Sequence, residues 1–147
     1  MNVLIADDEN VMIRLLSTAF RQAGFATFVA FDVVQATMTI RRQRIDAVVL
    51  DMSMPGGSGA HVIQRLKLSK RTGNIPIIVV SGSVELDARE RILALGADDF
   101  FVKPPDLEKL VKSLRRLTDP RRPSFSPANL RRDPAMELNG SVEYFGA

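Results

Sequence analysis

The chain has 147 residues, of which 46% are apolar, with 20 Lys and Arg against 17 Asp and Glu, one His and no Cys. A chain of this length forms one ordinary globular domain, and folding buries roughly 65–70% of the surface that the unfolded chain exposes. The core therefore needs no disulfide or structural metal, and the lack of cysteine excludes a disulfide. The formal net charge of only +3 argues against direct binding to nucleic acid.

No apolar run approaches the roughly 20 residues that cross a bilayer. Acidic residues at Asp7 and Asp8 come too early for a secretory signal peptide. We therefore expect a soluble cytoplasmic protein without a membrane partner.

Short apolar runs alternate with longer segments of helical periodicity along the first 118 residues. The apolar runs are too short for helices and predict buried strands, whereas the longer segments predict amphipathic helices. In chain order, the expected strand and helix pairs are 2–6 and 11–23, 26–30 and 33–42, 47–50 and 60–68, 77–80 and 86–95, and 100–102 and 107–117.

Residues at the helix ends agree with this assignment. Gly24 and Gly96 stand where a helix ending favours a left-handed residue, and Asp106 can cap the last helix after Pro104 and Pro105. Strands that alternate with helices favour a parallel sheet with helices on both faces, because a parallel connection needs a crossover of about a dozen residues. The nearly all-apolar strands fit burial on both sides.

The character of the sequence changes after Thr118. Residues 119–147 hold four of the eight prolines, and their four arginines balance four acidic residues. We interpret 119–147 as a Pro-rich C-terminal tail without a recognisable effector domain. The whole net positive charge therefore belongs to residues 1–118.

Polar and charged residues follow four of the five predicted strands. Asp7 and Asp8 follow the first strand, Asp51 the third, Ser81 the fourth and Lys103 the fifth. Ligands of open parallel sheets bind at the carboxyl ends of the strands, so we expect these side chains to meet. Crowded carboxylates need cations between them, and all-oxygen ligands suit Mg²⁺. No His or Cys cluster supports zinc.

Each of these residues also has a simpler explanation. Asp7 and Asp8 could interact with a helix dipole, Asp51 could cap a helix, and Ser81 could be a turn hydroxyl. Lys103 is the hardest to explain in this way, because a lysine at the end of a buried strand needs a partner.

The ordered set of motifs closely resembles the receiver domain of two-component response regulators. It comprises Asp7-Asp8, Asp51 with the following Met-Ser-Met-Pro-Gly-Gly-Ser-Gly, Ser81-Gly82, and Lys103-Pro104 at the end of Gly-Ala-Asp-Asp-Phe-Phe-Val-Lys-Pro. The resemblance covers residues 1–118. It implies an α/β, doubly wound, flavodoxin-like fold with a five-stranded parallel sheet of order 2-1-3-4-5 and helices on both faces.

The resemblance also implies roles for the acidic residues. Asp51 would accept a phosphoryl group from a phosphohistidine on a histidine kinase or a histidine phosphotransfer protein. Asp7 and Asp8 would hold Mg²⁺ together with Asp51 and the backbone carbonyl of Ser53.

Three further residues would stabilise and read the phosphorylated state. Lys103 would neutralise phosphoryl charge, and the Ser81 hydroxyl, in place of the frequent Thr, would hydrogen-bond to the phosphoryl oxygen and draw its loop inward. The aromatic Phe100 would then turn inward, and without a hydroxyl it would act only through packing.

We therefore expect a phosphorylation-activated switch that acts on an unknown downstream protein and is not an enzyme beyond its own Mg²⁺-dependent phosphorylation and dephosphorylation. One alternative is a phosphorylation-independent binding module that acts through its basic surface or its C-terminal tail. The tail itself could also be the output. A phosphatase with an aspartate nucleophile is disfavoured, because Ser53 stands where a second acid is needed. A truncated DNA-binding regulator lacks its recognition helix.

Overall fold

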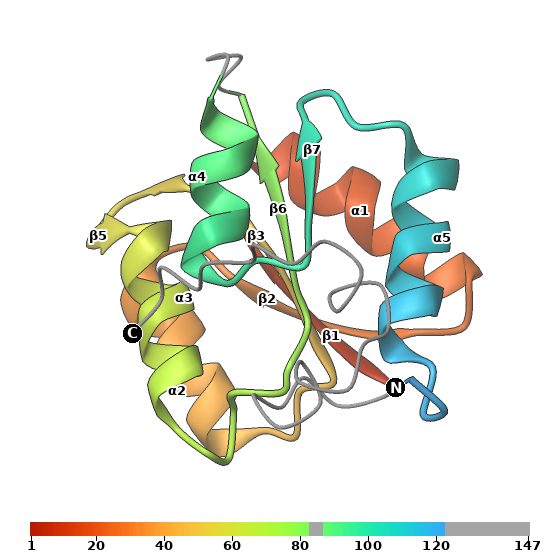
Figure 1. Ribbon diagram of the computed structural model, residues 1–147. Coiled ribbons are helices and arrows are strands. Elements are labelled where there is room, and N and C mark those ends of the chain that lie inside the picture. The colour runs from red at the N-terminus through yellow and green to blue at the C-terminus, as the bar shows by residue number, and fades with distance from the viewer. Residues whose placement is uncertain (83–86, 123–147) are drawn as a thin grey trace, which may run out of the picture.

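The computed structural model describes residues 1–82 and 87–122, which form a parallel sheet between two helical layers (Figure 1). Its strand order, β2-β1-β3-β6-β7, confirms the predicted order 2-1-3-4-5 of the five main strands. The elements are β1 (Asn2–Ala6), α1 (Asn10–Gln22), β2 (Ala26–Ala30), α2 (Val33–Arg42), β3 (Ala47–Leu50), β4 (Ser53–Met54), β5 (Gly57–Ser58), α3 (Gly59–Leu68), β6 (Ile77–Ser81), α4 (Ala88–Leu95), β7 (Asp99–Val102) and α5 (Leu107–Thr118).

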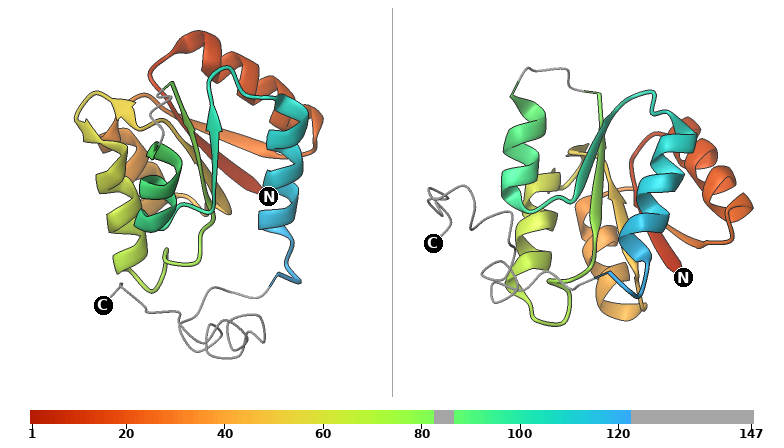
Figure 2. Two further views of the ribbon diagram at one scale, coloured as in Figure 1. Left: turned by 45° about the horizontal axis from the view of Figure 1, so that its top comes forward. Right: turned by 45° about the vertical axis from the view of Figure 1, so that its right-hand side comes forward.

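The central strands are apolar at nearly every position because both faces of the sheet are covered. Leu4 and Val48 pack with residues of α2, α3 and α4 on one face. Their neighbours Ile5 and Val49 pack with residues of α1 and α5 on the other. Figure 2 shows the two layers from two further directions. Successive strand residues thus serve different cores, which explains why β1 and β3 lack the alternating pattern of a half-exposed strand.

The predicted helix ends are confirmed. The Asp106 side chain accepts a hydrogen bond from the Lys109 backbone N–H at the start of α5. Gly96 ends α4 with φ of 116°, and Gly24 follows α1 with φ of 94°. Because a side chain disfavours a positive φ, glycine suits both positions.

The boundaries differ from the prediction by a residue or so at several ends. Strand β6 continues to Ser81 because this residue pairs with Val102, and β7 begins at Asp99 because this residue pairs with Ile78. The predicted helix 86–95 includes Leu86, which lies outside the described residues. Its described part begins at Ala88.

The chain turns back on itself between β3 and α3. The two-residue strands β4 and β5 pair antiparallel there, with φ of 84° at Gly56 and 139° at Gly57. The Ser58 hydroxyl then accepts the Ala60 backbone N–H at the start of α3. This short hairpin carries the chain away from Asp51 and into the helix.

Helix α5 ends at Thr118, and the described chain continues to Arg122. Residues 123–147 of the predicted tail lie outside the described residues, so the absence of an effector domain stays a prediction. None of the helices in the described ranges is long and apolar enough to cross a membrane.

The packing of α5 predicts a large loss of stability in Leu114→Ala. Leu114 is fully buried between α5 and the sheet, so the truncation removes apolar contacts and leaves a cavity. We expect the free energy of unfolding, measured by urea denaturation, to fall by about 2–5 kcal/mol. The matched variant Leu68→Ala, at a residue 86% exposed, should change it by less than about 0.5 kcal/mol. Equal losses in both variants would contradict this packing.

Candidate functional site

The predicted site residues lie at the carboxyl edge of the sheet. The Asp51 backbone N–H donates to the Ala6 carbonyl at 2.8 Å, so the ends of β3 and β1 lie side by side. The Lys103 backbone N–H donates to the Ser81 carbonyl at 2.8 Å, so the ends of β7 and β6 also lie side by side. The ends of four strands that are far apart in sequence thus form one surface.

The ammonium group of Lys103 lies among three carboxylates. Its Nζ is 2.9 Å from Asp7 Oδ2, 2.9 Å from Glu9 Oε1 and 3.2 Å from Asp51 Oδ2. The Lys103 side chain is only 11% exposed, and those of Asp7 and Asp51 are 3% and 5% exposed. Because buried charges need partners, this arrangement explains how a lysine and two aspartates are held inside the protein.

The surroundings shift the pKa values of two of these groups. Burial raises the pKa of Asp51 above its ordinary value of 3.8, against the opposing effects of the Ser53 N–H and the Lys103 charge. Burial alone would lower the pKa of Lys103, but hydrogen bonds to Glu9 and Asp7 and the charge of Asp51 raise it. Lys103 therefore stays charged at neutral pH and offsets the crowded negative charge.

Three carboxylates at this edge have the spacing of a metal site. Oxygen atoms of Asp7, Asp8 and Asp51 all lie within 4.8 Å of one another. Asp7 and Asp51 are buried, whereas Asp8 is exposed. A hard oxygen-ligand set that is open to water on one side fits Mg²⁺, which keeps several waters in its coordination shell. The residues present could therefore hold this ion.

Ser53 lies beside the carboxylates. Its backbone N–H donates to Asp51 Oδ1 at 3.1 Å. This contact holds the residue two positions beyond Asp51 close to the cluster. The role of its carbonyl as a metal ligand stays a prediction.

The simpler explanations of the aspartates fit the structure poorly. Helix α1 has Glu9 at its N-cap and no acidic residue in its first turn, so Asp7 and Asp8 precede the helix. Ser58, and not Asp51, caps α3. The Asp7 side chain instead accepts the Glu9 N–H at 2.9 Å and contacts Lys103.

The two predicted switch residues are both buried. Ser81 is 4% exposed at the end of β6. Phe100 is 8% exposed and belongs to the core on the α2, α3 and α4 side of the sheet. The aromatic ring of Phe100 is therefore buried in this conformation. The switching roles of both residues stay predictions.

Glu9 is a site residue that the sequence interpretation did not single out. Its side chain is 59% exposed, and it supplies one of the three carboxylates around Lys103. The available signal was its place in the run Asp7-Asp8-Glu9 directly after a buried strand.

Gly59 allows α3 to begin against the backbone of the Asp51 segment. A Cβ atom at this position would lie 2.8 Å from the Met52 Cα and 2.9 Å from the Asp51 carbonyl oxygen. The Gly59 N–H also donates to the Met52 carbonyl at 3.1 Å. The first turn of α3 is thus packed directly on the segment that carries Asp51.

Comparisons with known proteins identify the family of the chain. The family model "Response regulator receiver domain" matches residues 3–115, so the chain belongs to the response regulator receiver family. The chain is 36% identical over 117 residues to the probable transcriptional regulatory protein TcrX of Mycobacterium tuberculosis, covering 80% of this chain and 49% of that protein. It is 32% identical to sporulation initiation phosphotransferase F of Bacillus subtilis, covering 78% and 90% of the two chains.

Solved structures give the same result for the fold. The receiver domain of the Francisella response regulator 1452 is 30% identical with a TM-score of 0.74, and 80% of this chain covers 95% of it. The chemotaxis response regulator CheY4 of Vibrio cholerae is 25% identical with a TM-score of 0.73, and 79% of this chain covers 97% of it. The chain spans about half the length of the relatives named as transcriptional regulators.

The raised pKa of Asp51 predicts that Asp51→Asn stabilises the fold at neutral pH when a chelator is present. Burial disfavours the charged carboxylate, whereas the amide is neutral and still accepts the Ser53 N–H. We expect urea denaturation to give a higher free energy of unfolding for the variant than for the wild type.

The pH dependence gives the control. A folded pKa above 3.8 means that the Asp51 contribution to stability is fully present below that pH and is lost as the pH rises through the folded pKa. The advantage of the variant should therefore shrink as the pH falls toward 3.8. Mg²⁺ should stabilise the wild type more than the variant. A variant less stable than the wild type at neutral pH would contradict the prediction.

Proposed function

We propose that the protein is a phosphorylation-activated switch of two-component signalling, with Asp51 as the phosphoryl acceptor. The observation that carries this proposal is the position of the Asp51 carboxylate. It is buried at the carboxyl edge of the sheet, 3.2 Å from Lys103 Nζ and within reach of the Asp7 and Asp8 carboxylates. Membership of the receiver family supports the same function.

The reaction transfers a phosphoryl group from a phosphohistidine to Asp51. A carboxylate oxygen of Asp51 forms the new O–P bond as the P–N bond of the donor breaks, and the leaving imidazole keeps the electron pair and takes a proton from solvent. The attacking carboxylate and the phosphoryl group are both anionic, so the site must neutralise charge and hold the reactants in line. Lys103 provides a fixed positive charge for this purpose.

Asp7, Asp8 and Asp51, with the Ser53 carbonyl, would hold Mg²⁺. The ion, when bound, supplies positive charge for the phosphoryl oxygens. Asp7 stays oriented through the Glu9 N–H, and the exposed Asp8 leaves one side open to solvent. This opening is also the side from which a phosphodonor can approach.

Phosphorylation adds negative charge and strong hydrogen-bond acceptors at one point of the sheet edge. Ser81 lies at the end of β6, where its hydroxyl can donate to the phosphoryl group. Lys103 would shift partners from carboxylates to phosphoryl oxygens, and β7 connects it to Phe100 in the core. The downstream protein would therefore read the surface formed by α4, β7 and α5.

The phosphodonor would be a histidine kinase or a histidine phosphotransfer protein, since a phosphohistidine suits an aspartate acceptor. The relative named a sporulation initiation phosphotransferase supports a place in a phosphorelay. Beyond its own phosphorylation and dephosphorylation, we propose no enzymatic activity for residues 1–118.

The first test is intact-protein mass spectrometry after incubation with acetyl phosphate and Mg²⁺. The wild type should gain one phosphoryl group, because acetyl phosphate is a small donor that needs no protein docking. A chelator should prevent the gain. Asp51→Asn should show none, because the amide oxygen is a poor nucleophile.

The matched control is Asp46→Asn, which changes an aspartate at the opposite end of β3 and should be labelled like the wild type. Labelling of Asp51→Asn to the wild-type extent would refute Asp51 as the acceptor. A lack of labelling in every folded variant would favour a phosphorylation-independent binding module.

The second test concerns the metal ligands. Asp8→Ala should weaken Mg²⁺ binding at least about tenfold and slow phosphorylation, because it removes the exposed carboxylate of the cluster. Isothermal titration calorimetry would measure the affinity. Glu108→Ala removes a carboxylate from the first turn of α5 and should leave the affinity unchanged. Equal affinity in the wild type and Asp8→Ala would overturn the ligand assignment.

A further inference from the structure

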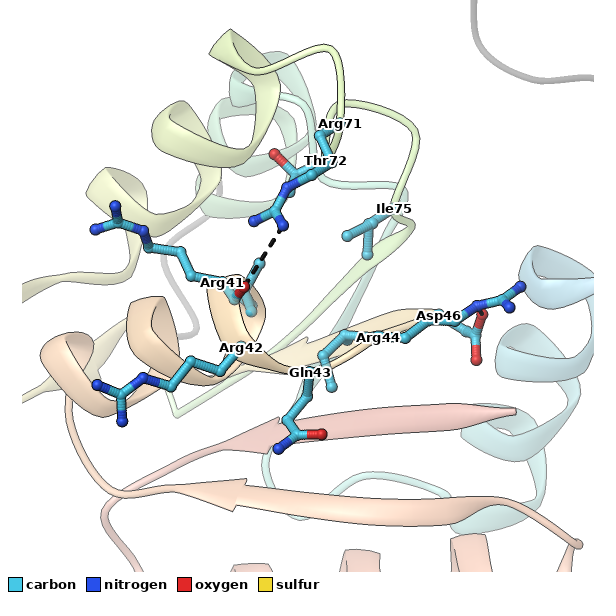
Figure 3. A pocket seen from close by; sticks show the side chains of 10 residues that line it. Arg41, Arg42, Gln43, Arg44, Asp46, Arg71, Thr72 and Ile75 are labelled. Carbon is cyan, nitrogen blue, oxygen red and sulfur yellow. Dashed lines mark hydrogen bonds and ion pairs between the residues drawn. The ribbon is translucent and has the colours of Figure 1, made fainter.

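A pocket lies at the amino-terminal edge of the sheet, opposite the Asp51 site. It has a volume of about 420 Å³ and lies between the end of α2, the segment before β3 and the loop before β6 (Figure 3). An adjoining pocket of about 260 Å³ extends it along α3 and shares Ile40, Arg41, Arg71 and Thr72 with it. Together they form a groove, the α2–α3 groove.

The α2–α3 groove combines apolar and positively charged surface. The apolar part of the lining comes from Ile75, which is half-buried, and from Ile40 and Ile45, which are only 6% exposed at its floor. Around them, Figure 3 shows Arg41 and Arg42 directed to one side and Arg44 to the other. The guanidinium groups are therefore spread along the rim and do not converge on one point. Such a surface fits an extended acidic segment with apolar side chains better than a small anion.

Most of this positive charge has no carboxylate partner within the described residues. Arg44 lies 3.8 Å from Asp46, whereas Arg41, Arg42 and Arg71 form no ion pair in the described part of the chain. The ends of α2 and α3 also lie here, but a helix end carries only about half a negative charge. Two helix ends therefore offset about one of these cations, and an excess of positive charge remains.

The end of α5 is tied to the same edge of the sheet. The Arg122 side chain donates to Asp98 Oδ1 at 3.2 Å, and Asp98 Oδ2 accepts the Ile77 N–H at 2.9 Å. Ile75, two residues before Ile77, lines the pocket. The chain that follows Arg122 therefore starts from the same edge of the sheet as the α2–α3 groove. Figure 1 likewise shows the ends of α2, α3 and α5 at one end of the molecule.

The sequence beyond Arg122 contains a segment of matching chemistry. Residues 133–145 hold Asp133, Glu137 and Glu143 and no Lys or Arg, which gives a formal charge of −3. Apolar residues are interspersed with these acids. The ten residues 123–132 span up to roughly 33–36 Å when extended. A 100-residue domain has a radius of gyration of about 13 Å, so a linker of this length can reach from Arg122 to the groove.

We propose that residues 133–145 bind to the α2–α3 groove of their own chain. The carboxylates pair with the arginine rim, and an apolar side chain of the segment packs against the half-buried Ile75. Short tethering favours the intramolecular contact, because the segment is held at high effective concentration near the groove. The inference is independent of phosphoryl transfer at Asp51.

The test is a paramagnetic relaxation measurement on the full chain. Because the sequence has no cysteine, Asn139→Cys provides a single site for a nitroxide label. We expect the amide signals of Ile45 and Ile75 to be lost in the labelled protein and to return when the nitroxide is reduced. The loss should be the same at high and at low protein concentration, because the contact is intramolecular. The double change Arg41→Glu and Arg71→Glu should restore these signals.

The controls separate charge at the groove from charge in general. Arg41 and Arg71 are exposed, so their replacement should leave the dispersed amide spectrum of the fold intact. In Arg14→Glu, which changes the exposed face of α1, the Ile45 and Ile75 signals should still be lost. Neutralising Asp133, Glu137 and Glu143 together should abolish it.

Three outcomes would overturn the proposal. The Ile45 and Ile75 signals could remain unaffected by the label, which would leave the groove for a segment of another protein. The loss could disappear on dilution, which would indicate a second copy of the chain. It could also persist in the Arg41→Glu and Arg71→Glu protein, which would show that these arginines do not hold the segment.

Discussion

The ammonium group of Lys103 holds the functional edge of the sheet together. Asp7 and Asp51 lie almost fully buried at the ends of neighbouring strands, where their negative charges would repel each other. The lysine follows the edge strand β7, which is separated from β3 by β6. A single cation thus links the ends of β1, β3 and β7. The same charge prepares the site for a phosphoryl group, so stability and chemistry depend on one interaction.

Much of this architecture is predictable from the sequence because the determining signals are local. Short apolar runs, a capping Asp106 and the left-handed Gly96 define elements without reference to distant residues. The strand order and the edge that collects Asp51 and Lys103 then follow from the rules of parallel sheets and from the family resemblance.

The features that escaped prediction depend on contacts between distant residues. The β4–β5 hairpin has strands of two residues each, too short for any periodicity. Glu9 is a site residue only because Lys103, 94 residues later, reaches it. The groove at the other edge has the same origin, since Arg71 meets the end of α2 from 30 residues away. In the sequence alone, its arginines look like ordinary helix-end cations.

The close contact at Gly59 couples the start of α3 to the Asp51 segment. Even a methyl group would not fit between the start of this helix and the backbone of the Asp51 segment, so that segment cannot move toward the helix unless the helix moves as well. Ten residues of α-helix are about 15 Å long, and a tilt of about 4° at one end therefore moves the other by roughly 1 Å. The far end of α3 carries Leu66, which borders the opposite edge of the molecule. The helix thus spans the distance from the Asp51 segment at one edge of the sheet to the groove at the other.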